Sequence, residues 1–283
     1  MASQGRIKRK FRELRARSEA ALVPFIVAGD PDLDTTRRLV LELEARGADL
    51  IEIGVPFSDP TADGPANQRA LARGLGAGAS IAAILSMVSE IRTQTEIPII
   101  LYGYYNPIFH YGCEQLCADA ARAGVDALLV VDLPMEEAGE LKQPARANGL
   151  DIIQLLAPTT PIERSRKIAR SASGFIYYVS VTGVTGARTH LASDLSAHIR
   201  ELRSITDLPL CVGFGISTPA QAAEVAAIAD ALAVGSAISL LIESHTSSGD
   251  VIAAVGGLVG AMKDAMRAAR TSESAARLGN ADG

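Results

Sequence analysis

The chain has 283 residues, of which 48% are hydrophobic and 21% charged, with a formal net charge of −5. The acidic balance argues against a polyanionic partner, and the lack of an apolar run of about 18 residues or of a signal-peptide core argues against membrane insertion and export, so we expect a cytoplasmic protein. Aromatic residues make up only 4% and Trp is absent, so the core must consist of the Ala, Leu, Ile and Val that fill parallel sheets.

The first predicted element is an amphipathic helix near the N-terminus. Ile7, Phe11 and Leu14 recur at intervals of three and four and would form its apolar side. Its other positions are strongly basic: Arg6, Lys8, Arg9, Lys10, Arg12, Arg15 and Arg17. A solvated basic face is the favoured interpretation of this run, and contact with nucleic acid is the alternative.

After this helix, one alternation of strand and helix repeats eight times. Short and nearly continuous apolar runs are typical of strands that are covered on both faces, and they occupy residues 22–28, 50–54, 97–101, 127–131, 152–156, 175–179, 208–212 and 231–234. Helical periodicity fills segments 35–45, 80–91, 114–123, 136–147, 161–169, 194–202 and 219–227. Some helices have clear end signals, such as Thr218-Pro219 at a start and Gly124 after an end.

This alternation predicts the fold class. Strands that alternate with helices form a parallel sheet, and eight units imply closure into a (β/α)₈ TIM barrel with an extra N-terminal helix. An open, doubly wound sheet is the alternative. We expect one domain over residues 1–270, and a disordered tail over 271–283, where apolar periodicity is missing.

Two acidic residues in and after the second apolar run are candidates for catalysis. Active residues of such barrels lie at the carboxyl ends of strands and in the following loops. Glu52 sits within an apolar strand, where burial should raise its pKa and suit it for proton exchange near neutrality; a structural carboxylate is the alternative. Asp63 lies in a loop rich in Pro, Asp and Gly that can return it to the same mouth, although an isolated loop Asp is usually a turn former.

Glycine-rich loops follow the last three apolar runs. Segment 180–188 has little bulk and could close over a ligand or be an ordinary connection, and Tyr177 just before it is either a pocket residue or barrel filler. Gly213 and Gly215 lead into one helix, and Gly235 and Ser236 lead into the next. Backbone N–H groups at helix N-termini favour anions, so these two loops predict a phosphate site.

The three cysteines, Cys113, Cys117 and Cys211, match no disulfide framework. Cys113 and Cys117 lie one helical turn apart and could in principle share a metal ion. No His accompanies them on that helix, so we expect structural thiols and no metal site.

In chain order, the motifs of this sequence resemble those of the tryptophan synthase alpha chain family. They are P-F-I-V-A-G-D-P at 24–31, E-I-G-V-P-F-S-D-P-T-A-D-G-P at 52–65, Y-Y-N-P at 104–107, D-L-P at 132–134, A-P-T-T at 157–160, G-V-T-G at 183–186 and G-F-G-I at 213–216. The likeness runs from about residue 6 to residue 270. It implies retro-aldol cleavage of indole-3-glycerol phosphate to indole and glyceraldehyde 3-phosphate in tryptophan biosynthesis, without a cofactor or a metal.

The resemblance also implies a role for individual residues. Glu52 matches the family's general acid/base, and Asp63 matches the carboxylate that binds the indole N–H and stabilises positive charge on the ring. The remaining expected substrate contacts are Phe25, Tyr104, Leu129, Tyr177, Thr185, Gly186, Gly213, Phe214, Gly215, Gly235 and Ser236. Asn67 and Gln154 depart from the family pattern, and either would matter if it faced the pocket.

The family resemblance implies a partner as well. It is a PLP-dependent beta chain that receives the indole in an α₂β₂ heterotetramer, with segments 106–107 and 132–134 at the contact. A stand-alone lyase that releases free indole is one alternative, and a non-catalytic allosteric partner is another. The presence of both Glu52 and Asp63 argues against the last.

Overall fold

The computed structural model describes residues 5–179, 188–213, 215–246 and 250–279, and the side chains of 188–194 and 271–279 are outside that description. Eight parallel strands pair in chain order and close into a barrel, so the predicted (β/α)₈ fold is confirmed and the open sheet is excluded. The strands are β1 Ala21–Val27, β2 Ile51–Gly54, β3 Ile99–Gly103, β4 Ala127–Val130, β5 Asp151–Leu156, β6 Ile176–Val179, β7 Leu210–Gly213 and β8 Ala231–Val234.

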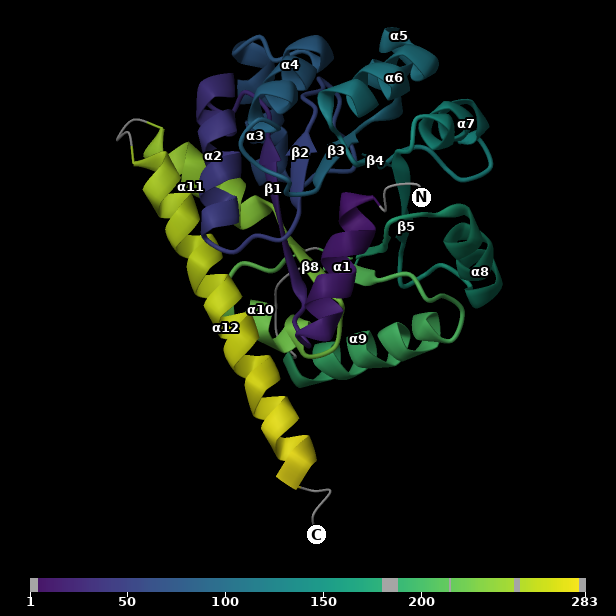
Figure 1. Cartoon of the computed structure of the whole chain (residues 1–283), viewed down its shortest axis with the longest axis vertical. Coiled ribbons are helices and arrows are strands. Elements are labelled where there is room, and N and C mark those ends of the chain that lie inside the picture. The colour runs from purple at the N-terminus through teal and green to yellow at the C-terminus, as the bar shows by residue number, and fades with distance from the viewer. Residues whose placement is uncertain (1–4, 180–187, 214, 247–249, 280–283) are drawn as a thin grey trace.

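Helices surround this barrel (Figure 1). They are α1 Arg6–Ala16, α2 Leu33–Ala45, α3 Pro65–Gly76, α4 Ile81–Ile91, α5 Tyr105–Tyr111, α6 Cys113–Ala123, α7 Gly139–Ala147, α8 Ile162–Ser171, α9 Arg188–Arg203, α10 Pro219–Ala226, α11 Ser236–His245 and α12 Val251–Gly279. Within the described ranges, none of these helices is long and apolar enough to span a membrane by itself; the pair α3 and α4, bent by 93°, passes that test only when taken together.

The structure adds helices that the sequence pattern did not predict. α3 and α5 lie in the connections after β2 and β3, α12 follows α11, and α9 begins at Arg188 rather than at residue 194. α12 continues to Gly279, past the predicted domain limit at residue 270. The single-domain boundary and the disorder expected over 271–283 stay predictions.

Local signals explain where several helices begin and end. The Thr218 side chain accepts a hydrogen bond from the backbone N–H of Gln221, whose own side chain accepts one from the Thr218 backbone N–H, so a capping box opens α10 at the start that the sequence predicts. Asp32 caps α2 because its side chain accepts the Thr35 backbone N–H at 2.7 Å. Gly124 ends α6 with a positive φ of 93°, which a residue without Cβ adopts without strain.

The α1 helix closes the amino-terminal end of the barrel. Its apolar side, predicted from Ile7, Phe11 and Leu14, is buried against the residues that point into the barrel, and the Phe11 and Phe175 rings lie 5.8 Å apart. Figure 1 shows α1 lying over the middle of the strands. The inward-facing residues packed with it are Ala21, Val23, Leu50, Ile100, Ala127, Leu129, Ile153, Phe175, Tyr177, Cys211, Ala231 and Ala233.

The long α12 helix packs along α2, α10 and α11 on the outside of the barrel (Figure 1). It carries Lys263, which is only 1% exposed. The Lys263 ammonium lies 2.7 Å from an Asp49 carboxylate oxygen and 3.2 Å from one of Glu19, and it also donates to the Ala20 carbonyl. Two carboxylates and a carbonyl compensate the burial of this charge, so α12 is joined to the segments that begin β1 and β2.

Candidate active site

Glu52 points into the barrel from the middle of β2. It lies in register with Phe25 of β1 and Ile100 of β3, on the same strand face as the inward Leu50. The side chain is 1% exposed, and its Oε1 atom has no hydrogen-bond partner among the described residues. Burial raises the pKa of Glu52 from its usual 4.5 to about 8. At neutral pH this carboxyl therefore keeps its proton and can give it to a bound molecule.

Asp63 is held in the turn between β2 and α3 by a group that directly follows β3 and by another on α3. The Tyr104 hydroxyl donates to Asp63 Oδ2 at 2.6 Å, and the Asn67 side-chain amide donates to Oδ1 at 3.3 Å. Tyr104 also accepts the Ala62 backbone N–H at 3.0 Å, so one phenol fixes both the loop and its carboxylate. Burial raises the pKa of Asp63, and the hydrogen bonds from Tyr104, Asn67 and Tyr102 oppose that rise because they favour the ionised form.

Two tyrosines, the buried Tyr177 and the half-buried Tyr102, lie within interaction range of both carboxyls. The pKa of Tyr102 is raised first by burial and then by the charges of Asp63 and Glu52, and the pKa of Tyr177 is raised by burial, by Glu52 and, more weakly, by Asp63. These shared neighbours place Glu52 and Asp63 at one site although they come from different segments. Sequence reasoning missed Tyr102; its place two residues after the inward Ile100 was the signal that could have found it.

Aromatic and aliphatic side chains form an apolar wall beside the carboxyls. The Phe25 and Tyr102 rings meet edge to face with centroids 4.8 Å apart, and Leu129 points into the same barrel interior. Gly54 makes room for Phe25, because a Cβ there would lie 2.7 Å from the ring. Gly213 makes room for Tyr177 in the same way, because a Cβ at that position would overlap the phenol. The two glycines let aromatic rings approach the backbone closely.

The amino end of α11 borders this wall. Gly235 precedes α11, and a Cβ there would lie 3.2 Å from Phe25 and 3.5 Å from Asn67. The first-turn N–H groups of this ten-residue helix, which begins at Ser236, therefore start beside the apolar wall. Gly215, after β7, has a φ of +78°. A helix N-terminus carries partial positive charge and suits an anionic group.

The two residues that depart from the family pattern have different places. Asn67 belongs to the site: its amide nitrogen contacts Asp63, and its oxygen accepts from the Ser239 hydroxyl at 2.9 Å. Gln154 is buried but alternates with the inward Ile153, so it lies between the sheet and α7 rather than in the barrel interior. Only Asn67 bears on the chemistry of the site.

The structure thus brings most of the predicted site residues together. Those it places around the two carboxyls or in the barrel interior beside them are Phe25, Glu52, Asp63, Tyr104, Leu129, Tyr177, Gly213 and Gly235. Thr185, Gly186 and Phe214 lie outside the described residues. Where the chain is described, no group of three or more His, Cys, Asp or Glu side chains could hold a metal ion, and all three cysteines are buried and free.

Comparison with known proteins gives one consistent family. A family model described as "Tryptophan synthase alpha chain" matches residues 11–267. A tryptophan synthase alpha chain of Citrifermentans bemidjiense is 56% identical over 258 residues, which cover 91% of this chain and 96% of the relative. The alpha chain of Geotalea uraniireducens is 54% identical over 263 residues, covering 93% and 98%.

Solved structures of high similarity carry the same name. Tryptophan synthase subunit alpha from Legionella pneumophila superposes with a TM-score of 0.87 at 39% identity, over 93% of this chain and 99% of that chain. A chain of Mycobacterium tuberculosis tryptophan synthase superposes with a TM-score of 0.83 at 32% identity, over 94% and 99%.

Proposed function

The chain belongs to the tryptophan synthase alpha chain family, and we propose on that premise that it cleaves indole-3-glycerol phosphate to indole and glyceraldehyde 3-phosphate. The reaction breaks the bond between indole C3 and the first glycerol carbon. One proton must be delivered to C3, and one must leave the hydroxyl that becomes the aldehyde. The observation that carries the proposal is the buried Glu52 carboxyl with a pKa of about 8, whose Oε1 has no hydrogen-bond partner among the described residues.

Glu52 serves as the acid and then as the base. The protonated carboxyl gives its proton to C3, which leaves a positive charge on the ring nitrogen and a carboxylate at Glu52. That carboxylate takes the proton of the adjacent glycerol hydroxyl, the C3–C bond breaks, and its electron pair returns to the ring. The proton lost by Glu52 is regained, so the enzyme is restored. Acid–base catalysis of this kind contributes about 10²–10⁴-fold.

Asp63 stabilises the charge that develops on the ring nitrogen. Its two oxygens are held by Tyr104 and Asn67, and these hydrogen bonds favour the ionised carboxylate that a cationic ring requires. A fixed carboxylate in a site with little water interacts strongly with such a charge and needs no reorganisation during the reaction. Phe25, Tyr102 and Leu129 supply the apolar wall for the indole ring.

The phosphate of the substrate binds at the loops after β7 and β8. The helix N-terminus at Gly235 and Ser236 supports this placement, because it borders the Phe25 wall and favours an anion. Gly235→Val should weaken inhibition by glycerol phosphate, since the added side chain would occupy space beside Phe25. Gly139→Val is the matched control, because a Cβ at Gly139 meets nothing within 4 Å. If glycerol phosphate inhibits both variants equally, the substrate phosphate does not bind beside Gly235.

Indole release by Glu52→Gln tests the proposed chemistry. The amide keeps the shape of the side chain but cannot give and take the proton, so turnover should fall by about 10²–10⁴-fold. Glu224→Gln, the same change at an exposed position on α10, should leave turnover unchanged. If Glu52→Gln releases indole at the rate of the parent chain, Glu52 is not the general acid/base of the reaction.

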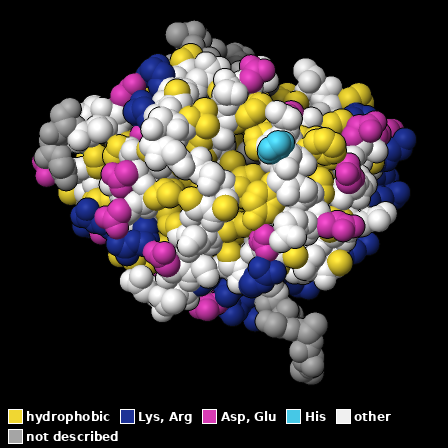
Figure 2. Space-filling view, turned by 90° about the horizontal axis from the view of Figure 1, so that it is seen from above, with side chains coloured by type: hydrophobic (Ala, Val, Ile, Leu, Met, Phe, Trp, Pro, Cys, Tyr) yellow, Lys and Arg dark blue, Asp and Glu magenta, His cyan; other side chains and the backbone are white. Residues whose placement is uncertain are grey.

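A PLP-dependent beta chain is the proposed partner, in an α₂β₂ assembly. The segments expected at the contact are adjacent: the Asp132 carboxylate accepts the Tyr105 backbone N–H at 2.7 Å, which joins the start of α5 to the loop after β4. Phe109 of α5 is 57% exposed. Figure 2, seen from the side of α4 to α6, shows hydrophobic side chains gathered near the middle of this face. An apolar area of this kind supports a protein contact.

Indole release with and without a beta chain distinguishes the proposal from the stand-alone alternative, because stimulation by the partner is expected only in the assembly. Phe109→Asp should reduce that stimulation and leave the basal rate unchanged. Leu240→Asp is the control, at an apolar residue of α11 that is 48% exposed. High turnover that a beta chain does not alter would favour a stand-alone lyase.

A phosphorylated substrate does not cross membranes unaided, which supports the cytoplasmic location expected from the sequence.

A further inference from the structure

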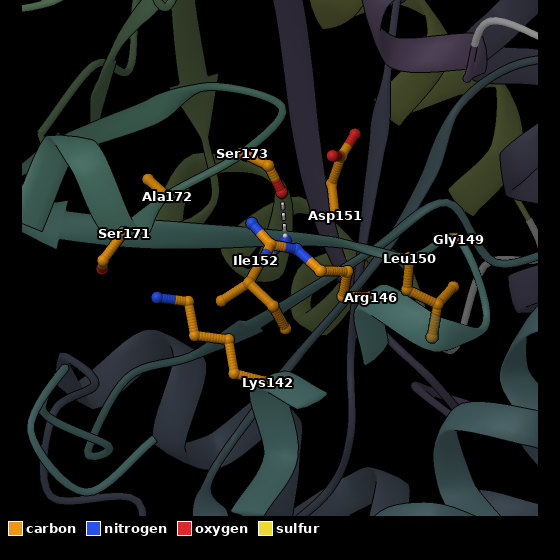
Figure 3. Close-up of a pocket in the computed structure, with 9 residues that line it drawn as sticks. All are labelled: Lys142, Arg146, Gly149, Leu150, Asp151, Ile152, Ser171, Ala172 and Ser173. Carbon is orange, nitrogen blue, oxygen red and sulfur yellow. Dashed lines mark hydrogen bonds between the residues drawn. The ribbon is translucent and has the colours of Figure 1, made fainter. Parts of the chain in front are cut away.

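A cavity with charged and hydroxyl side chains in its lining lies at the other end of the barrel from the candidate active site. It has a volume of about 220 Å³ and lies between α7 and the segments that lead into β5 and β6 (Figure 3). Asp151 begins β5 and Ser173 precedes β6, so the cavity is at the amino ends of these strands, whereas Gly213 and Gly235 follow the carboxyl ends of β7 and β8. Its lining residues are Lys142, Arg146, Gly149, Leu150, Asp151, Ile152, Ser171, Ala172 and Ser173.

Two cations of α7 face this cavity. Lys142 and Arg146 are one helical turn apart and extend into the same space in Figure 3. In the part of the chain that the structure describes, neither side chain has an ion pair or a hydrogen bond. The pKa of Lys142 is lowered by burial and by the positive charge of Arg146. Like charges four residues apart destabilise a helix, so the presence of these two cations is not explained by a contribution to the stability of α7.

Hydroxyl groups lie on the opposite wall. Ser171, the last residue of α8, has a buried Oγ with no hydrogen-bond partner among the described residues. Ser173 Oγ accepts the Ile152 backbone N–H at 2.9 Å, as the dashed line in Figure 3 shows. A buried hydroxyl that lacks a partner has a free-energy cost that a bound acceptor would remove.

The carboxylate in the lining does not neutralise the two cations. Asp151 has interactions of its own, because the Ser173 hydroxyl and the positive charge of Lys8 both lower its pKa against the effect of burial. Its carboxylate points away from the Lys142 ammonium in Figure 3. The side of the cavity that Lys142, Arg146 and Ser171 line is therefore positively charged and rich in hydrogen-bond donors.

We propose that this cavity binds a small phosphate anion, either inorganic phosphate or a phosphomonoester, between Lys142, Arg146 and Ser171. An Arg guanidinium can bind two phosphate oxygens side by side, a Lys ammonium adds a compact charge, and the hydroxyl donates to a third oxygen. The volume is below the about 300–1,000 Å³ of pockets that enclose drug-sized ligands, so a small anion suits it. This site shares no residue with the candidate active site, and its ligand does not depend on the proposed reaction.

Titration of the full chain with inorganic phosphate, and separately with methyl phosphate, followed by NMR, tests the site. We expect saturable shifts in the backbone amide signals of Gly149, Ser171 and Ala172 with at least one of the two probes. Removing both cations in Lys142→Ala/Arg146→Ala should weaken binding at these signals by at least about tenfold. Arg166→Ala/Lys167→Ala, which removes the same two charges from exposed positions of α8, should leave the affinity unchanged.

Two further variants separate the site from general charge effects. Ser171→Ala keeps both cations and should weaken binding by about threefold to tenfold, because only the hydroxyl is lost. Asp151→Asn should tighten binding, because it removes the one negative charge in the lining. Absence of saturable shifts at these amides with either probe would overturn the proposal, and so would equal affinity of the chain with and without Lys142 and Arg146. Because the signals belong to the amino-terminal end, phosphate bound in the active site cannot imitate this result.

Discussion

Replacing Glu52 with Gln should stabilise the fold while it slows catalysis, and the gain in stability should grow with pH. The native carboxyl has a pKa of about 8 because it is buried, whereas the unfolded one has the usual value of 4.5. Between these two values the native state holds a proton that the unfolded state has released, so the free energy of unfolding falls as pH rises. Gln carries no such proton, and its stability lacks this dependence.

The magnitude follows from the two pKa values. A pH of 7 is about 2.5 above the pKa of the unfolded carboxyl, whereas the native carboxyl is still protonated. At about 1.4 kcal/mol for each pH unit, this difference lowers the free energy of unfolding by about 3 kcal/mol. At pH 5 the loss is below about 1 kcal/mol. The stability difference between Glu52→Gln and the parent chain should therefore grow by about 2–3 kcal/mol from pH 5 to pH 7.

Urea unfolding of both chains at several pH values measures this difference, with Glu224→Gln as the control for an exposed carboxyl. The slope is informative because a contribution from amide hydrogen bonding would be the same at every pH. A stability difference that stays constant between pH 5 and pH 8 would refute the reasoning, since it would mean that the Glu52 carboxyl is not desolvated in the native state.

Three other substitutions have expected outcomes that follow from single contacts. Asp63→Asn should slow indole release by about 10²-fold or more with little change in the fold, which steady-state kinetics and circular dichroism would show; an unchanged rate would argue against charge stabilisation by this residue. Gly213→Ala should destabilise the chain by about 1–3 kcal/mol in urea unfolding, because its methyl group would overlap Tyr177; a neutral effect would mean that the ring can move. Lys263→Met should cost about 3–5 kcal/mol by leaving Asp49 buried without its cation, and Lys263→Met/Asp49→Asn should recover much of that loss if the pair itself is the cause, because Asn removes the charge and keeps an oxygen for the Leu22 backbone N–H.

Hydrophobic periodicity was sufficient to predict the barrel. Each strand is covered by helices on one side and by other strands on the other, so its sequence is a nearly continuous apolar run that can be recognised without knowing its neighbours. The helices α3 and α5 escaped prediction because they occur within connections whose composition of Pro, Gly and Asn is typical of loops. α3 nevertheless places Asn67 against Asp63, a contact that depends on how the loop returns to the barrel.

The sequence predicted a site residue where a polar side chain interrupts an apolar segment. It did not predict contacts between residues that are far apart in the sequence. Glu52 was recognisable because a carboxyl interrupts an apolar strand. Tyr102 was not, because a tyrosine in a strand is ordinary, and its proximity to both carboxyls comes from the curvature that closes β3 against β2 and β4. The role expected for Asp63 came from family resemblance, whereas its partners Tyr104 and Asn67 emerge only from the folded chain.

The position of α1 constrains the order in which the chain can become fully folded. The apolar side of α1 is covered by residues from strands as distant as β8, and β8 completes the ring by pairing with β1 through Ala231 and Ala21. A ribosome releases α1 before all eight strands and β8 after the other seven. A nascent chain that is still missing its last strand therefore exposes Phe11 and its neighbours to water, and a helix that emerges before every strand is among the last to be fully covered.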